Sequence, residues 1–350
     1  MHYTTFGRRT GLRVSEYALG AGNFGTAWGS GADRDESRAI FDRFAEAGGT
    51  LIDTADGYQV GESETFLGEF LAADRDHFAV ATKYSLGPRA GDVSTSGNGR
   101  ANMVRSVEDS LRRLRTDHID LYWVHHPDRV TPMEEILRGL DDLVTAGKIL
   151  HVGLSNFPAW RVSRAAAIAD ARGWVPLAGI QVEYSLVERT ADRELLPMAD
   201  ALGLGVALWS PLGGGLLTGK YRHSRAGRLT DWQRLVHTED SAQKTAVVDT
   251  LLTVAEKAGA SPAQVAVAWL RARADRVDAV HVPVIGPRNV AQLDDYLAAL
   301  DLELAPEQVA ELDSVSAVPL GVPHGVGDTV HDGVLGGDAS AFRHPVHPVA

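Results

Sequence analysis

The sequence predicts a closed (β/α)8 barrel, the TIM barrel, with a small hairpin before it and a tail after it. Short apolar runs alternate with longer stretches of helical periodicity from about residue 17 to about residue 300. Such alternation is typical of parallel strands joined by helical crossovers. Eight apolar runs occur in this span, and a (β/α)8 barrel typically has about 250 residues. We therefore expect a single domain, with a hairpin at about 1–16, the barrel at about 17–300 and a C-terminal segment at about 301–350.

The expected elements follow one another regularly. Residues 3–14 alternate around a turn that contains Gly11, which predicts the hairpin. The apolar runs expected as strands lie at 17–19, 50–52, 78–81, 119–124, 150–154, 179–182, 206–209 and 280–284. Helical periodicity is clear at 36–47, 100–114, 133–146 and 158–171. Asp33 is placed to cap the first of these helices.

Composition narrows the class of protein. The 350 residues carry a net charge of -12, which argues against nucleic-acid and anionic-membrane partners, because both are bound mainly by clustered Lys and Arg. The sequence has no cysteine, its first residues do not resemble a signal peptide, and no stretch has about 18 consecutive apolar residues. We therefore expect a cytoplasmic protein. The sequence gives no signal for the oligomeric state.

Polar side chains end successive predicted strands. Asp53 follows the second strand, Lys83 the third and His125 the fourth. The next three strands end in Ser155 and Asn156, in Gln181, and in Trp209 and Ser210. Because the carboxyl ends of barrel strands form one face, these side chains predict a site on that face.

One short stretch is compatible with a different fold. Gly20-Ala-Gly22-Asn-Phe-Gly25 is a formal G-x-G-x-x-G after a strand, and Asp53 lies where a Rossmann-type dehydrogenase binds a ribose. In that fold the third glycine belongs to a helix, whereas here loop-forming residues continue to about Asp33. An open sheet also gives no reason for evenly spaced units. The barrel is favoured, and the Rossmann fold stays as an alternative.

Several short motifs occur in a recognisable order along the chain. They are Asp53-Thr-Ala-Asp-Gly-Tyr58, Gly61-Glu-Ser-Glu-Thr-Phe-Leu-Gly68, Ala81-Thr-Lys83, His125-His-Pro-Asp, Val152-Gly-Leu-Ser-Asn156, Gln181-Val-Glu-Tyr, Trp209-Ser-Pro-Leu-Gly-Gly-Gly215 and Ile285-Gly-Pro-Arg288. As an ordered set they resemble the aldo-keto reductases. The resemblance covers residues from about 16 to 300, and the tail after about Leu320 carries no motif.

The resemblance implies a catalytic tetrad of Asp53, Tyr58, Lys83 and His125. Reduction of a carbonyl group by a nicotinamide hydride requires a proton at the oxygen, where negative charge develops. Tyr58 would donate it, and because a free phenol has a pKa of about 10, a neighbouring cation is needed to stabilise the phenolate. Lys83 would be that cation, held and kept charged by Asp53. His125 would orient the carbonyl oxygen or share the proton transfer, so the Tyr58 hydroxyl should lie within reach of Lys83 and His125.

The resemblance also implies a nicotinamide cofactor. Ser155, Asn156 and Gln181 would bind the carboxamide of the nicotinamide. Trp209 would stack beneath the ring and leave its other side to the substrate.

Basic residues and glycines predict where the phosphates of this cofactor would bind. The candidates for the pyrophosphate lie in one glycine-rich loop and are Ser210, Leu212, Gly214 and Lys220. Arg288 precedes the last helix of the barrel, where its charge and the helix dipole both favour a phosphate, which suggests NADPH over NADH. Gly286 is a further cofactor candidate, and Gln292 and Asp295 would reach the adenosine. The family often has Asn after Asp295, whereas this chain has Tyr296, so contacts to the adenine stay open.

The substrate pocket is less clearly marked. Candidates from the loops after the strands are Phe24, Trp28, Tyr84 and the region 221–240, together with the tail. His126 would face away from His125, since side chains alternate along a strand, and is interpreted as structural. The histidines of the tail lack the spacing of metal ligands, so no metal site is expected.

Together these features predict an NADPH-dependent reductase of a small-molecule carbonyl substrate, an aldehyde or a ketone, which also works in the direction of alcohol oxidation. A second reading stays open. Potassium-channel β subunits share this fold and can keep the tetrad, so the chain could instead be a nicotinamide-binding regulatory subunit.

Overall fold

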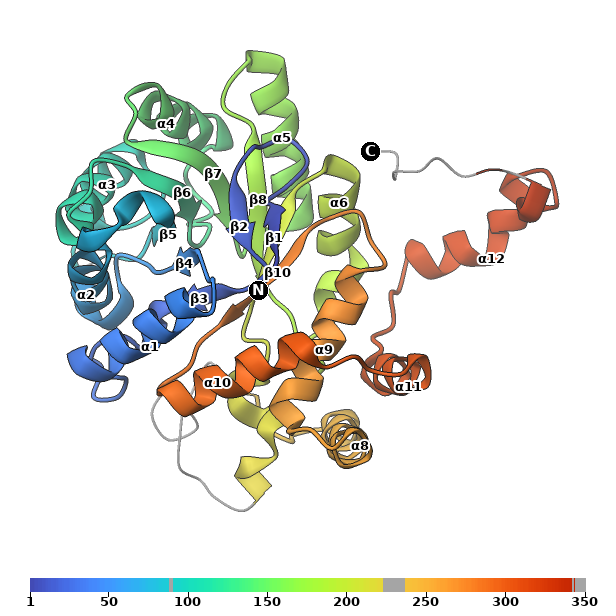
Figure 1. Cartoon of the computed structure of the whole chain (residues 1–350). Helices are drawn as coiled ribbons and strands as arrows, with labels where there is room; N and C mark the ends of the chain where they lie inside the picture. The colour runs from blue at the N-terminus through green and yellow to red at the C-terminus, as the bar shows by residue number, and fades with distance from the viewer. Residues whose placement is uncertain (88–90, 223–236, 342, 344–350) are drawn as a thin grey trace.

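Eight parallel strands close into a barrel, as the sequence predicts (Figure 1). The computed structural model describes residues 1–350 apart from 88–90, 223–236, 342 and 344–350. The strands are β3 (Ala18–Gly20), β4 (Leu51–Asp53), β5 (Ala79–Tyr84), β6 (Ile119–Val124), β7 (Ile149–Ser155), β8 (Leu177–Glu183), β9 (Gly205–Trp209) and β10 (His281–Ile285). They pair in that order, and β10 pairs in parallel with β3 to close the ring. The closed ring excludes the open Rossmann sheet.

Helices cover the outside of this ring (Figure 1). They are α1 (Arg34–Glu46), α2 (Glu62–Phe70), α3 (Arg100–Leu114), α4 (Met133–Thr145), α5 (Ala159–Arg172), α6 (Leu195–Leu202), α8 (Ala242–Ala258), α9 (Pro262–Ala274), α10 (Val290–Ala298) and α11 (Pro306–Ser316). In α4 the buried residues Ile136, Leu137, Leu140 and Leu143 recur at helical spacing, which turns one apolar face toward the barrel. Asp33 caps α1 as expected, because its side chain accepts a hydrogen bond from the Glu36 amide at 2.9 Å.

The N-terminal hairpin covers the end of the barrel where the strands begin. It consists of β1 (Tyr3–Thr5) and β2 (Arg13–Ser15), which pair antiparallel. The ring of Phe6 is fully buried and lies edge-on to Trp123, with ring centroids 6.1 Å apart. A Cβ atom on Gly205 would lie 2.9 Å from the Phe6 ring, so the glycine at the start of β9 makes room for it. The hairpin therefore leaves the opposite end of the barrel free for a site.

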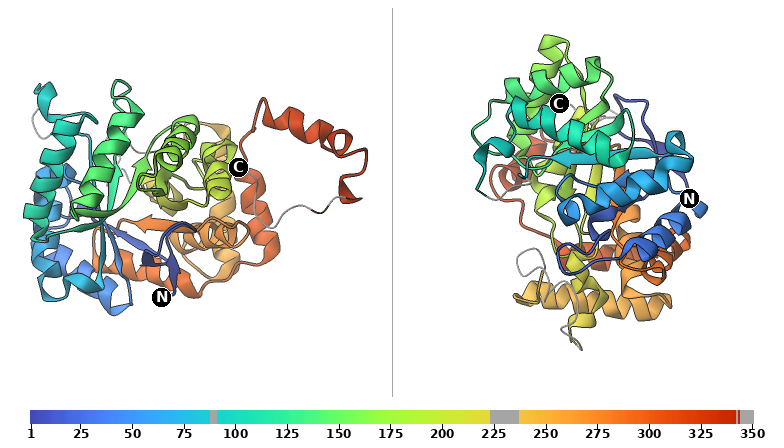
Figure 2. Two further views of the ribbon diagram at one scale, coloured as in Figure 1. Left: turned by 90° about the horizontal axis from the view of Figure 1, so that it is seen from above. Right: turned by 90° about the vertical axis from the view of Figure 1, so that its left-hand side faces the viewer.

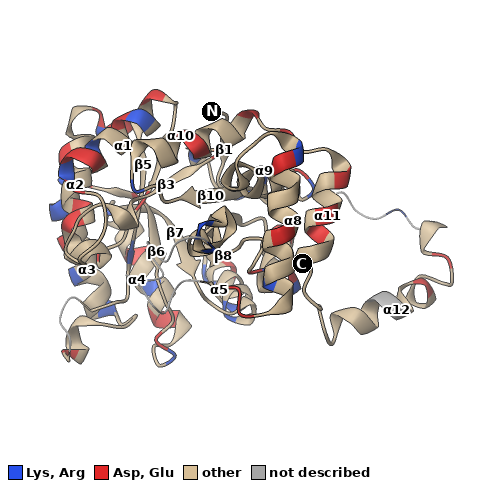
Figure 3. Ribbon diagram, turned by 90° about the horizontal axis from the view of Figure 1, so that it is seen from below, with Lys and Arg blue, Asp and Glu red and all other residues tan. Residues whose placement is uncertain are grey.

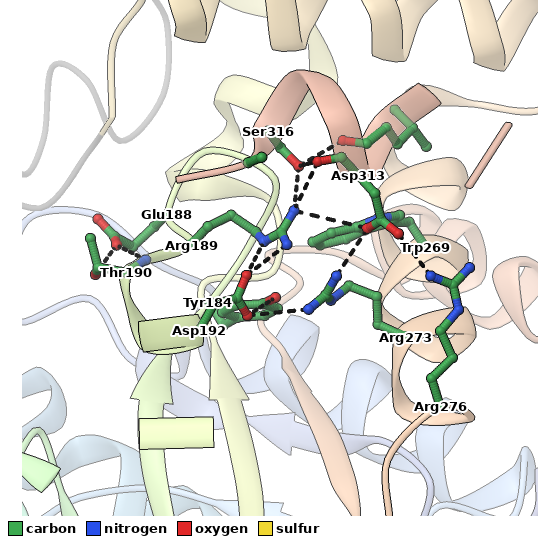
Figure 4. Close-up of polar contacts among 12 residues, drawn as sticks. Tyr184, Glu188, Arg189, Thr190, Asp192, Trp269, Arg273, Arg276, Asp313 and Ser316 are labelled. Carbon is green, nitrogen blue, oxygen red and sulfur yellow. Dashed lines mark hydrogen bonds and ion pairs between the residues drawn. The ribbon is translucent and has the colours of Figure 1, made fainter. Parts of the chain in front are cut away.

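A network of charged and aromatic side chains attaches α11 to the barrel (Figure 4). Arg189, from the loop after β8, donates to the Ser316 hydroxyl at 2.6 Å. Arg273 of α9 bridges two carboxylates, with Asp313 at 3.1 Å and Asp192 at 3.2 Å. The segment up to about residue 316 is thus fixed against the barrel, although the sequence motifs end near 288.

The tail beyond α11 forms a further helix, α12 (His324–Val334), which the sequence did not predict. It stands away from the barrel in both Figure 1 and Figure 2. Basic and acidic segments are interspersed over the helices around the barrel (Figure 3). Among the residues that the structure describes, no helix is both long and apolar enough to span a membrane. Nor does any group of three or more His, Cys, Asp or Glu side chains in the described part form a metal-binding cluster.

Candidate active site

Buried polar side chains gather where the barrel strands end. Asp53 is the last residue of β4, Lys83 lies near the end of β5, and His125 follows β6. Tyr58 begins a short 3₁₀ turn between β4 and α2. The Nζ atom of Lys83 donates hydrogen bonds to Asp53 Oδ2 at 2.6 Å and to the Tyr58 hydroxyl at 3.1 Å. It also donates to the carbonyl oxygen of Thr54 at 2.7 Å, so its three donors are all used.

Lys83 keeps its charge although its side chain is fully buried. Burial alone would lower the pKa of Lys83. The charge of Asp53 and the hydrogen bonds to Asp53 and Tyr58 outweigh burial, so the pKa of Lys83 lies above its ordinary value of 10.5. At neutral pH an ammonium group therefore lies beside the Tyr58 hydroxyl. A cation in this position is suited to stabilise a Tyr58 phenolate.

His125 lies beside Tyr58 as a neutral imidazole. The two ring centroids are 5.9 Å apart, with the planes at 79°. Burial first, and then the charge of Lys83 and the neighbouring His126, lower the pKa of His125 well below its ordinary value of 6.5. A neutral imidazole has one donor and one acceptor nitrogen. Its buried Nδ1 has no hydrogen-bond partner among the described residues. The ring also lines the cavity, so it is suited to orient a carbonyl oxygen by donating one hydrogen bond.

Two amide side chains link the ends of the neighbouring strands. Gln181 Nε2 donates to Asp53 Oδ1 at 2.8 Å, so both carboxylate oxygens of Asp53 have partners. Asn156 donates to the backbone carbonyl of His125 at 3.1 Å and accepts a hydrogen bond from Trp209 Nε1 at 3.1 Å. The indole ring of Trp209 is thereby fixed in orientation within the site.

The glycines of the formal G-x-G-x-x-G stretch lie against the barrel and the tetrad. A Cβ atom on Gly20 would lie 2.9 Å from the Val284 side chain, and one on Gly22 would lie 3.6 Å from the Tyr58 ring. Asp53, which the Rossmann alternative assigned to a ribose, is instead paired with Lys83. The glycine spacing that resembles a dinucleotide fingerprint therefore lies within the barrel wall and beside Tyr58, rather than at a Rossmann phosphate site.

A cavity of about 580 Å³ joins the tetrad to the loops after β9 and before α10. The predicted site residues that line it are Trp28, Asp53, Tyr58, His125, Asn156, Gln181, Trp209, Ser210, Leu212, Gly214, Lys220, Gly286, Arg288, Gln292 and Asp295. Lys83 lies behind Tyr58, out of contact with the cavity. Residues far apart in the sequence thus meet in one cavity.

The end of this cavity near α10 carries positive charge. Arg288 directly precedes Asn289, whose side chain caps α10 by accepting from the Gln292 amide at 2.9 Å. Gln292 Oε1 accepts from the Arg288 amide at 2.9 Å, which fixes the loop before the helix. Lys220 lines the same cavity from the loop after β9. Arg288 beside a helix N-terminus forms a suitable environment for phosphate, and Lys220 adds a second basic side chain to the cavity wall.

Two predicted cofactor residues are engaged within the protein. Asp295 accepts hydrogen bonds from Ser261 Oγ at 2.9 Å and Gln264 Nε2 at 2.8 Å, which ties α10 to the start of α9. Ser155 is fully buried, accepts from Asn156 Nδ2 at 3.0 Å and is not part of the cavity wall. Asp295 still lines the cavity, whereas Ser155 contacts Asn156 and does not reach the cavity.

The sequence model of the Aldo/keto reductase family matches residues 17–317, which include all eight barrel strands. The chain belongs to this family. The match extends beyond the stretch covered by the motifs and ends one residue after α11. It therefore includes the segment that the network around Arg189 attaches to the barrel.

Several relatives within the family are similar over most of their length. The uncharacterized oxidoreductase YrpG of Bacillus subtilis is 38% identical over 333 residues, 92% of this chain and 98% of its own. The aryl-alcohol dehydrogenase [NADP(+)] of Phanerodontia chrysosporium is 36% identical, covering 90% of this chain and 86% of its own. The norsolorinic acid reductase of Aspergillus flavus is 35% identical, covering 89% and 80% respectively. These names and the family support the conclusion that the chain is an oxidoreductase.

Two of the predicted substrate residues lie outside the cavity of this aldo/keto reductase. Phe24 is fully buried against Phe70, with ring centroids 6.4 Å apart. Tyr84 is fully buried and stacked on Tyr122 at 5.3 Å. Successive side chains of β5 alternate between the inside and the outside of the barrel. Because Lys83 faces inward, the next residue, Tyr84, faces outward. The expectation that Phe24 and Tyr84 line the pocket is therefore corrected.

His126 was expected to face away from the site but lines the cavity. Its ring stacks on that of His125, with centroids 4.4 Å apart and planes at 19°. Strand β6 ends at Val124, so the alternation expected of an extended strand no longer applies at these two positions. The end of the apolar run at Val124 was the signal that could have indicated this. Most of the predicted pocket region 221–240 falls on 223–236, outside the described residues.

Proposed function

We propose that the protein is an NADPH-dependent reductase that converts an aldehyde or ketone to the alcohol, and the alcohol back. The observation that carries this proposal is the 3.1 Å hydrogen bond between Lys83 Nζ and the Tyr58 hydroxyl at the cavity. Bound NADPH would supply a hydride to the carbonyl carbon. The Tyr58 hydroxyl gives its proton to the carbonyl oxygen, and the charge of Lys83 stabilises the resulting phenolate. In alcohol oxidation the Tyr58 phenolate takes the proton back.

The residues of the cavity fit such a cofactor. Trp209 presents an indole ring held by Asn156, which is suited to stacking beneath the nicotinamide. Arg288 and Lys220 would hold the phosphates at the other end. The name of the Phanerodontia relative, which includes NADP(+), also supports a 2′-phosphorylated cofactor.

Arg288→Ala is expected to weaken NADPH binding far more than NADH binding. A hydrogen bond to a charged group contributes about 1.5–3 kcal/mol, so the Kd for NADPH should rise by roughly 10-fold to 100-fold while that for NADH changes little. Titration calorimetry on both cofactors measures the difference. Arg276→Ala is the matched control, because Arg276 is half-exposed, pairs with Asp313 and is not part of the cavity wall. Equal weakening of both cofactors would contradict a 2′-phosphate at Arg288.

Aromatic aldehydes are the substrate class that the cavity favours. Trp28, Tyr58 and His126 give it several aromatic walls. The name of the Phanerodontia relative, which refers to aryl alcohols, points the same way.

NADPH oxidation across a panel of aryl aldehydes, aliphatic aldehydes, ketones and sugars tests this function. We expect turnover with at least the aryl aldehydes, at values of kcat/KM that exceed those for sugars. Tight NADPH binding without turnover of any carbonyl would overturn the enzyme proposal and favour the regulatory-subunit reading instead.

A further inference from the structure

The turn that carries Tyr58 also holds the loop that carries Trp28. Gln59, the residue after Tyr58, is fully buried. Its Nε2 donates to the carbonyl oxygens of Ser30 at 2.9 Å and Gly22 at 3.4 Å, and its Oε1 accepts from the Trp28 amide at 2.9 Å. One side chain thus ties together the beginning, the middle and the end of the loop between β3 and α1.

A second side chain from the same region supports this loop. Glu62, the first residue of α2, accepts hydrogen bonds from the amides of Thr26 at 2.8 Å and Ala27 at 3.0 Å. A Cβ atom on Gly25 would overlap both Glu62 and Gln59, so the loop packs directly on these two side chains. The amides before Trp28 are therefore bound to α2, and the Trp28 amide itself is bound to Gln59.

The backbone at Gln59 is strained in a way that directs this side chain inward. Gln59 has φ 49° and Val60 has φ 56°, both in the left-handed region. That conformation costs about 1–2 kcal/mol per non-glycine residue, and it persists only where the surroundings fix it. The three hydrogen bonds of the Gln59 side chain are the contacts that fix it here. The turn after Tyr58 and the Trp28 loop therefore depend on each other.

Trp28 faces the place where the substrate would meet the proton donor. Its ring lies 6.2 Å from that of Tyr58, with the planes at 78°, and it lines the cavity. Its side chain is 39% exposed, so the loop rather than core packing sets its position. A contact between the Trp28 ring and a flat aromatic substrate next to Tyr58 would contribute about 0.5–1.5 kcal/mol, as aromatic pairs do.

We propose that Gln59 is a positioning residue that fixes Trp28 beside Tyr58, and that this wall gives the enzyme a preference for aromatic over aliphatic aldehydes. The inference rests on the proposed carbonyl reductase function and specifies its substrate class. Tyr58 has a separate anchor, since Lys83 holds its hydroxyl. Loss of the Gln59 side chain therefore weakens the binding of aromatic substrates more than it slows proton transfer.

Steady-state kinetics with benzaldehyde and butanal test the proposal. For Gln59→Ala we expect KM for benzaldehyde to rise about 5-fold to 10-fold, a loss in the range of one aromatic contact. KM for butanal and kcat for both aldehydes should change by less than about 2-fold, as when only ground-state binding is lost. Trp28→Ala should give the same pattern, and the double variant no further loss, because the two residues act as one unit. Equal losses with both aldehydes, or additive losses in the double variant, would overturn the proposal.

Two further variants distinguish the effect of the Gln59 side chain from the effect of the backbone conformation of the turn. Gln59→Glu is nearly isosteric, but its second carboxylate oxygen would face the carbonyl oxygens of Ser30 and Gly22 that Gln59 donates to, so the side chain should lose its place and behave like Gln59→Ala. Val60→Ala is the control, because Val60 shares the left-handed turn but its side chain is 69% exposed. It should leave the ratio of the two KM values unchanged, and a changed ratio would assign the effect to the turn itself.

A spectroscopic measurement tests the positioning without any turnover. The protein labelled with 5-fluorotryptophan should give a ¹⁹F NMR resonance for Trp28 that the Trp28→Phe variant identifies among the seven tryptophans. In Gln59→Glu this resonance should shift or broaden while the others stay in place. An unchanged Trp28 resonance would overturn the positioning role. A shifted resonance in a protein that reduces no aldehyde would keep that role and reject the carbonyl reductase function.

Discussion

Tyr58→Phe is expected to lower kcat/KM for carbonyl reduction by about 10²-fold to 10⁴-fold, the usual contribution of a positioned proton donor. The substitution removes only the hydroxyl that Lys83 contacts. The ring stays in place against Gly22 and Trp28, so the cavity keeps its shape. NADPH binding, measured by fluorescence titration, should therefore be nearly unchanged, and the loss should appear in kcat.

Tyr84→Phe provides the matched control for that experiment. Tyr84 is fully buried outside the cavity, and its hydroxyl donates to the Asn98 carbonyl at 3.3 Å. Tyr84→Phe also removes one tyrosine hydroxyl, but outside the cavity, so its kcat/KM should stay near that of the unmodified protein. If Tyr58→Phe retained full activity, or if both variants lost activity equally, Tyr58 could not be the proton donor.

Lys83→Met is expected to abolish most activity and also to destabilise the fold. Activity falls because no cation then stabilises the Tyr58 phenolate. Stability falls because Asp53, only 4% exposed, is left as an unpaired buried charge. Breaking a buried ion pair in this way typically costs about 3–5 kcal/mol. Urea denaturation at neutral pH measures the change in the free energy of unfolding.

The double variant Asp53→Asn/Lys83→Met separates the two effects. Removing both charges should restore much of the lost stability, because no uncompensated charge stays buried, while activity stays low. Recovery of activity in the double variant would contradict the role of Lys83.

The same ion pair has a defined dependence on pH. The pKa of Lys83 is raised in the folded protein, so the stability that its charge contributes is complete below the ordinary value of 10.5 and is lost as pH rises through the folded-state pKa. Lowering the pH leaves the contribution of the Lys83 charge intact, because Lys83 stays protonated in acid. The stability difference between the unmodified protein and Lys83→Met should consequently shrink in strongly alkaline solution, where Lys83 loses its charge.

Hydrophobic periodicity was sufficient to predict the barrel and most of its elements. The range 119–124 coincides with β6 and the range 100–114 with α3, because each segment carries an uninterrupted pattern with clear ends. The shorter strands were displaced by one or two residues, since a run of three apolar residues gives little information on its bounds. Helix α12 was missed because its glycines and histidines give no helical pattern.

The candidate site could be predicted to the extent that it depends on strand order. Asp53, Lys83 and His125 end neighbouring strands, and a parallel barrel brings such ends together whatever lies between them. Trp209 and Arg288 meet the same cavity for the same reason. Ser155 also ends a strand, yet its side chain is fully buried and does not line the cavity, because the end of a strand does not by itself determine which of its two faces a side chain occupies.

By itself the sequence determined the closed barrel, the hairpin before it and the set of polar residues at the strand ends, since these depend on local patterns and on one rule of topology. Only the tertiary structure decided that His126 faces the cavity, that Phe24 and Tyr84 do not, and that Gln59 holds the Trp28 loop. Gln59 makes its contacts with residues about 30 or more positions away. It does so from a left-handed turn, which the pattern of apolar residues in the sequence does not predict. Such contacts exist only after the chain has closed on itself, because their geometry is set by packing between distant segments.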